Sequence, residues 1–141
     1  MTIKEKSQAV VEEFSIFDDW MDKYSYLIEL GKELPLIDEK YKNQTHLISG
    51  CQSRVWLHAE DNNGVITFTA DSDAVITKGI ISLLINVLSE NKPADIVNAD
   101  FSFLDDIGLK SHLSPTRANG LVSMIKQIQL YARALQIKNN A

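Results

Sequence analysis

The sequence has few of the residues on which several common kinds of site depend. A single cysteine, Cys51, occurs among 141 residues, so no disulfide can form within the chain. The three histidines are His46, His58 and His112, and no two lie three or four positions apart, so their spacing gives little support to a zinc site. Neither a P-loop nor a Gly-x-Gly-x-x-Gly motif is present, so nucleotide binding lacks its usual phosphate cradle.

Positive charge is also scarce. Fourteen Lys and Arg residues against 19 Asp and Glu give a net charge of -5, and the pI is about 5.1. This balance disfavours nucleic acid and anionic membranes as partners, because both are bound largely through basic side chains. The most apolar run, residues 75–88, is too short and too polar to span a bilayer, and no basic-then-apolar leader opens the chain. We therefore expect a cytoplasmic protein whose lone thiol stays reduced.

What is present fits one domain over residues 1–141, with a core from about 14 to 135. No repeat, low-complexity tract or Gly/Ser linker divides the chain. Apolar residues at helical spacing predict four longer helices and two short ones. They cover residues 2–14, 16–30, 73–88 and 115–135, with short helices after Pro93 and over 102–107. We expect Ser15, Asp73 and Ser114 to act as N-caps and Gly31 to end the second helix.

The middle of the chain has the alternation of strands. Residues 55–60 and 65–69 read as two strands, and the Asp-Asn-Asn-Gly cluster at 61–64 predicts a hairpin turn between them. Residues 45–49 are a candidate third strand, which would make 50–53 a tight connection between strands. Helices, then a small antiparallel sheet, then helices define the α+β class.

Cys51 is the one candidate nucleophile of consequence. A lone cysteine is often a small buried apolar residue and nothing more. Cys51, however, follows Gly50 in a predicted loop, and functional residues concentrate in loops. Gly50 permits unusual backbone angles, and Arg54 is the nearby cation that would favour a thiolate. One thiol suffices for persulfide transfer, because the other sulfurs come from partners. A hydrolase that pairs Cys51 with His112 is a weaker alternative.

The stretch GCQSRVW at residues 50–56 resembles the active-cysteine motif of the SufE family, the sulfur acceptors that serve SufS-type cysteine desulfurases. Three other stretches agree in the family's order, at residues 24–31, 71–79 and 112–121. The resemblance covers residues 14–135. It implies helices packed on a three-stranded antiparallel sheet, a fold shared with IscU-like scaffold proteins.

The resemblance also implies a function. Cys51 would take persulfide sulfur from a SufS-type desulfurase, stimulate that enzyme, and deliver sulfur to a SufB-containing iron–sulfur assembly complex. Such a carrier is no stand-alone enzyme and has no metal or cofactor of its own, since pyridoxal phosphate belongs to the desulfurase. The residues that would organise the site or face the partner are Glu29, Gly50, Gln52, Arg54, Asp71, Asp73, Lys78, His112 and Arg117.

Two questions stay open at this point. The chain could instead be a non-catalytic module that regulates a desulfurase, with Cys51 incidental. The oligomeric state, a homodimer included, does not follow from the sequence.

Overall fold

The structure, a computed structural model, describes residues 1–139 and confirms the α+β class. Two helices, α1 (Ile3–Ser15) and α2 (Trp20–Lys32), precede a hairpin of β1 (Val55–Asn62) and β2 (Val65–Ser72). Two short 3-10 turns, η1 (Glu39–Tyr41) and η2 (Gln44–His46), lie between α2 and β1. The helices after the hairpin are α3 (Val75–Leu88), α4 (Pro93–Val97), α5 (Ser102–Asp106), α6 (Leu109–His112) and α7 (Pro115–Asn139).

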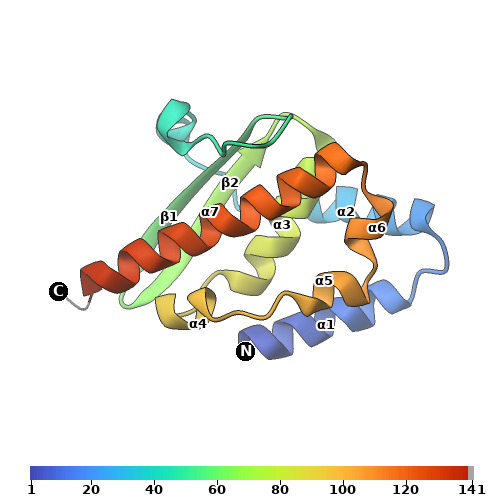
Figure 1. Ribbon diagram of the computed structural model, residues 1–141, viewed down its shortest axis with the longest axis horizontal. Coiled ribbons are helices and arrows are strands. Elements are labelled where there is room, and N and C mark those ends of the chain that lie inside the picture. The colour runs from blue at the N-terminus through green and yellow to red at the C-terminus, as the bar shows by residue number, and fades with distance from the viewer. Residues whose placement is uncertain (140–141) are drawn as a thin grey trace.

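Helix α3 is the centre of the fold, and α7 runs along the molecule in front of it (Figure 1). Helix α3 packs against β2, α2, α1 and α7. Ten of its 14 residues are buried, because apolar residues occupy most of its circumference rather than one stripe. Over residues 1–139, neither α3 nor any other helix combines the length and apolar character that a membrane span requires. Burial of α3 therefore explains its composition and gathers the other elements around it.

The predicted hairpin is confirmed. Strands β1 and β2 pair antiparallel along the full length of both. At the turn, Asn63 and Gly64 have φ values of 55° and 93°, the left-handed conformation that a two-residue hairpin turn needs. Alternate residues of β2 are buried, among them Ile66, Phe68 and Ala70, and α3 packs on this strand.

The expected third strand at residues 45–49 is wrong. Over residues 1–139 the sheet has two strands, and the expected segment contributes only an isolated bridge between Leu47 and Trp56. The Asn43 side chain accepts the backbone N–H of His46 and so closes the 3-10 turn η2. Because that turn uses the first residues of the segment, too few remain to form a ladder.

Of the three predicted N-caps, Ser114 is confirmed, whereas Ser15 and Asp73 are wrong. The Ser114 hydroxyl accepts the backbone N–H of Arg117 at 3.3 Å, at the start of α7. Helix α2, however, begins at Trp20 with Asp19 as its N-cap. Ser15 belongs to the end of α1, where its hydroxyl donates to a carbonyl of the preceding turn at 2.6 Å.

Helices α2 and α3 cross closely at two glycines. A Cβ on Gly79 would lie 2.2 Å from the carbonyl oxygen of Leu27, and one on Gly31 would lie 3.1 Å from the backbone nitrogen of Gly79. Across the same interface the buried Ser82 hydroxyl donates to the carbonyl of Leu30 at 2.7 Å. The expectation that Gly31 ends α2 is therefore wrong, because glycine is needed here for close approach and not for termination.

Replacing Gly79 with alanine should lower the free energy of unfolding by at least about 2 kcal/mol, because the new Cβ can be accommodated only if α2 and α3 separate. Urea denaturation followed by circular dichroism measures this change. Gly120→Ala is the matched control: its Cβ meets only the Cys51 Sγ, at an ordinary 3.6 Å. That variant should be neutral or gain up to about 1 kcal/mol from helix propensity. Equal urea midpoints for the two variants would show that Gly79 does not set the distance between α2 and α3.

Candidate functional site

The loop before β1 carries Cys51 and is held at its start. The backbone N–H of Ile48 donates to the carbonyl of Val55 at 2.8 Å, which closes the base of the loop. Gly50 has a φ of 89°, and a Cβ there would lie 2.4 Å from the Ser123 hydroxyl of α7. The left-handed backbone favours glycine immediately before the cysteine, and any larger residue would also displace the Ser123 hydroxyl.

The far end of the loop is held by a reciprocal pair of hydrogen bonds. The backbone N–H of Arg54 donates to Asp73 Oδ1 at 3.0 Å, and the N–H of Asp73 donates to the Arg54 carbonyl at 3.2 Å. Asp73 is thus not the cap of α3, as the sequence suggested. The N-cap is Ala74, which makes no side-chain hydrogen bond, so the first N–H groups of α3 have no side-chain partner at the cap.

Cys51 opens into a cavity of about 350 Å³ between its loop, α3 and the start of α7. Thr77 and Ile80 of α3 and Met124 of α7 line it and are buried. Arg117 also lines it but is exposed at the rim. The cavity therefore has a largely apolar inner wall and a polar mouth, large enough to admit more than one water-sized group.

The Cys51 thiol is shielded in this cavity, and its surroundings do not favour the thiolate. Cys51 is partly buried, and its S–H donates to the carbonyl of Gly120 at 3.6 Å. Burial raises the pKa of the Cys51 thiol. The exposed Arg54 side chain does not offset that effect, contrary to the expectation from the sequence. Because the thiolate is the reactive form, burial disfavours reaction of Cys51 in this conformation.

Asp71 forms an ion-paired cluster with two lysines at the end of β2. Its carboxylate lies 3.1 Å from Lys42 Nζ and 3.4 Å from Lys78 Nζ, and it accepts the backbone N–H of Ser72 at 2.8 Å. Burial alone would raise the pKa of Asp71. The hydrogen bonds from Lys42 and Ser72 and the two lysine charges outweigh burial, so the pKa lies below its usual value. The cluster ties the segment after α2 to the start of α3.

Two expected site residues lie away from Cys51. Glu29 pairs with Lys32 at 3.0 Å on an exposed face of α2. His112 stacks on Trp20 with ring centroids 4.0 Å apart. Neither lines the cavity of Cys51 in the part of the chain that the structure describes. A hydrolase that pairs Cys51 with His112 therefore has no geometric support.

The structure also joins two histidines that their spacing did not connect. His46 Nε2 lies 3.1 Å from His58 Nδ1, and His58 Nε2 lies 3.1 Å from Glu60 Oε1. The amide oxygen of Asn43 lies 2.9 Å from His46 Nδ1 and so requires a proton there. Burial and then the charge of His58 lower the pKa of His46. Among residues 1–139, no group of three or more His, Cys, Asp or Glu side chains is placed to hold a metal ion.

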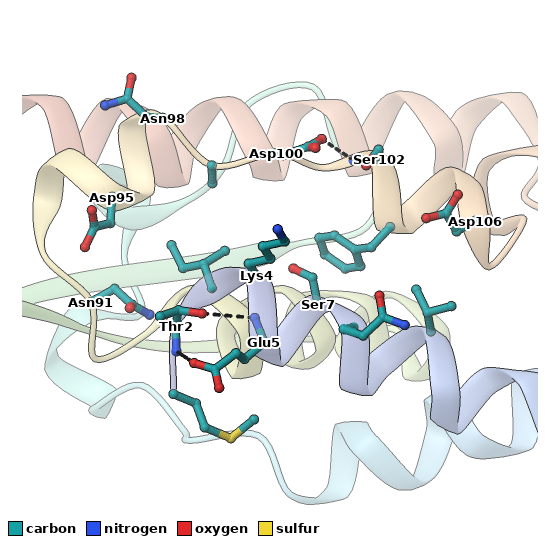
Figure 2. Close-up of a pocket in the computed structure, with 16 residues that line it drawn as sticks. Thr2, Lys4, Glu5, Ser7, Asn91, Asp95, Asn98, Asp100, Ser102 and Asp106 are labelled. Carbon is teal, nitrogen blue, oxygen red and sulfur yellow. Dashed lines mark hydrogen bonds between the residues drawn. The ribbon is translucent and has the colours of Figure 1, made fainter.

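A larger cavity, of about 880 Å³, lies between the start of α1 and the segment from α4 to α5 (Figure 2). No cysteine or histidine lines it. Its hydrogen-bonded polar groups serve helix ends: Thr2 and Glu5 form a capping box at 3.0 and 3.1 Å, and Asp100 accepts the N–H of Ser102 at 2.9 Å. We therefore place the candidate site at Cys51.

Sequence reasoning missed most of the wall around the thiol. The structure brings Cys51, Gln52 and Arg117 of the expected set to one cavity, with Gly50 adjoining it. It adds Ser53, Thr77, Ile80, Ser114, Thr116, Gly120 and Met124. Helical spacing was the available signal. Thr77 and Ile80 of α3 are three positions apart, and Gly120 and Met124 of α7 are four apart, so each pair lies on one helix face.

The geometry defines the class of the protein as a small α+β domain with a single thiol over a cavity. The family model described as "SufE: Fe-S metabolism associated domain" matches residues 8–132. The chain belongs to the SufE family, as the cysteine motif predicted.

Two relatives agree with this family assignment, and a solved structure agrees with the fold. The chain is 38% identical over 125 residues to an uncharacterized SufE-like protein of Rhizobium meliloti (strain 1021), covering 85% of this chain and 89% of that protein. It is 36% identical over 129 residues to an uncharacterized SufE-like protein of Rhizobium etli, covering 88% and 87%. The solution structure of a hypothetical protein from Thermus thermophilus matches with a TM-score of 0.76 at 20% identity, covering 92% of this chain and 94% of that one. This last likeness establishes the fold.

We expect iodoacetamide to modify Cys51 more slowly in the folded protein at neutral pH than in the urea-unfolded chain. Burial both shields the thiol and raises its pKa, so the pH midpoint of the reaction should lie above the ordinary value of about 8.5. Mass spectrometry over time at several pH values measures the rate. A pH midpoint below about 8.5 would contradict this expectation and would mean that a nearby cation offsets the effect of burial on the pKa of the thiol.

Asp71→Asn should lower the free energy of unfolding by about 1–2 kcal/mol at neutral pH, because it removes the charge that two lysines share. Since the folded-state pKa of Asp71 is lowered, its contribution is present above the unfolded value of about 3.9 and is lost as pH falls through the folded value. The melting temperatures of the wild type and Asp71→Asn, measured across pH, should therefore become equal in acid. Glu29→Gln, which breaks an exposed pair, is the control and should change little. A neutral-pH effect no larger than the control's would contradict this role.

Proposed function

We propose that this protein accepts sulfur on Cys51 from a SufS-type cysteine desulfurase, holds it as a persulfide, and passes it to iron–sulfur cluster assembly. The observation that carries the proposal is the placement of the chain's one thiol on a loop fixed at both ends, over a cavity of about 350 Å³. Membership of the SufE family, whose domain is associated with Fe–S metabolism, supports it.

The transfer is an exchange between sulfurs. The Cys51 thiolate attacks the terminal sulfur of the donor's persulfide, and a new S–S bond forms at Cys51. The donor's own S–S bond breaks, and its electron pair leaves on the donor cysteine as a thiolate. The sulfane sulfur moves without any net oxidation, so the step needs no external oxidant. Removing the donor's persulfide frees the desulfurase for another turnover, which accounts for stimulation of that enzyme.

The proposed partners are those that the resemblance to the SufE family implies. The donor is a desulfurase that carries pyridoxal phosphate, and this chain needs no cofactor of its own. The acceptor is a SufB-containing assembly complex, and the exchange takes place in the cytoplasm, where thiols stay reduced. Docking that draws the loop out of its cavity removes the burial that raises the pKa of the thiol. The thiol thereby becomes reactive only against a partner.

The proposal is tested by mixing the protein with an active SufS-type desulfurase and cysteine, followed by intact-mass spectrometry. We expect a gain of one or more sulfur atoms, removed by a reductant and mapped to Cys51. Cys51→Ser should gain none, since it removes the chain's only thiol. Its melting temperature should stay within a few degrees of the wild type, because the loop is held by backbone contacts to its neighbours.

The same variant separates the proposal from a regulatory module. A carrier loses stimulation of the desulfurase when Cys51 becomes serine. Full stimulation by Cys51→Ser, with no sulfur gained by the wild type, would establish a non-catalytic regulator instead.

A further inference from the structure

Thr77 carries a hydroxyl and lines the same cavity as Cys51. It is the third residue of α3, is 6% exposed, and lines the cavity of about 350 Å³ that contains the thiol. Within residues 1–139, neither its hydroxyl nor its backbone N–H forms a hydrogen bond. Threonine in a helix ordinarily bonds back to a carbonyl one turn earlier, and Thr77 does not. Among residues 1–139, Ser7 Oγ is the fully buried side-chain oxygen that lacks a partner, so the Thr77 hydroxyl keeps contact with the open cavity and is free to bond a group that enters it.

The rest of the inner wall offers nothing similar. Ile80 and Met124 are apolar and buried, and Gly120 presents a carbonyl. Among these four buried lining residues, Thr77 alone carries a side-chain hydrogen-bond donor. The other side-chain donors belong to the half-buried Ser53 and to four exposed residues, Gln52, Ser114, Thr116 and Arg117.

The resting thiol does not use Thr77. Its S–H donates to the Gly120 carbonyl, which can only accept. A persulfide reverses the requirement, because its ionised terminal sulfur has no proton to donate and needs a donor. The sulfur atom added to Cys51 is therefore not served by Gly120.

We propose that the Thr77 hydroxyl, at the N-terminal end of α3, donates a hydrogen bond to the terminal sulfur of the Cys51 persulfide and stabilises its anionic form. Helix α3 is 14 residues long and has no side-chain cap, so the positive end of its dipole favours an anion at the same place. This assignment rests on the proposed function and extends it, since it names the group that holds the cargo after transfer.

The test loads Cys51 with sulfur without a desulfurase. The thiolate attacks inorganic polysulfide, an S–S bond forms at Cys51, and the shortened polysulfide leaves with the electron pair. Excess polysulfide is removed, and iodoacetamide then alkylates the persulfide, forming an S–C bond as iodide leaves. Intact mass distinguishes the alkylated persulfide from the alkylated thiol, so both rates are measured across pH in one experiment.

The variants are Thr77→Val, which keeps the shape and removes the hydroxyl, and Thr77→Ser, which keeps the hydroxyl. For Thr77→Val we expect the pH midpoint of persulfide alkylation to rise by about one pH unit, since a lost hydrogen bond to the charged form raises a pKa. At pH values below the midpoints of both proteins, the persulfide of Thr77→Val should be alkylated about ten times more slowly than that of the wild type. Thr77→Ser should restore the wild-type midpoint.

The unloaded thiol is the internal control. Its midpoint should not change in Thr77→Val, because the thiol bonds to Gly120. An unchanged persulfide midpoint would overturn the assignment, and so would an equal change for thiol and persulfide, which would show a general effect of the cavity. Because polysulfide replaces the desulfurase, a protein that gives the expected midpoints here but takes no sulfur from a desulfurase contradicts the proposed function alone.

Discussion

The close crossing of α2 and α3 at Gly79 is the contact on which the surroundings of Cys51 depend. With a Leu27 carbonyl only 2.2 Å from where a Cβ would lie, the position of α3 relative to α2 is fixed within narrow limits. The start of α3 then fixes Asp73, and Asp73 fixes the end of the cysteine loop at Arg54. Core packing thus sets the position of a partly buried thiol, through hydrogen bonds at the ends of its loop and without help from the thiol itself.

Much of the fold was predictable, and the misses have physical causes. The hairpin and the two long helices after it follow from periodicity and turn chemistry that act over short stretches. Asp73 was misassigned because a carboxylate before a helix is equally suited to cap it or to bind another backbone segment, and here it binds the loop. The short helix α6 lacks a periodic stripe, and a 3-10 turn takes the first two residues of the segment 45–49, which was predicted as a strand.

The candidate site divides in the same way. Cys51 and Gly50 were predictable because loop chemistry and backbone freedom are local properties. Thr77 was not, because its place beside the site comes from a cavity formed by three segments far apart in sequence. Glu29 and His112 resemble family positions, yet the structure places them on α2 and against Trp20. A motif specifies residues, whereas the tertiary contacts decide which of them meet.

The two attachments of the cysteine loop limit how far sulfur can travel. Cys51 lies three residues from the anchor at Ile48 and three from the anchor at Arg54. An extended chain spans at most about 3.5 Å per residue, so Cys51 stays within about 10 Å of both anchors while they hold. On the proposed function, donor and acceptor thiols must each enter that same small region. The two partners therefore occupy it in succession, and the order of their visits sets the direction in which sulfur flows.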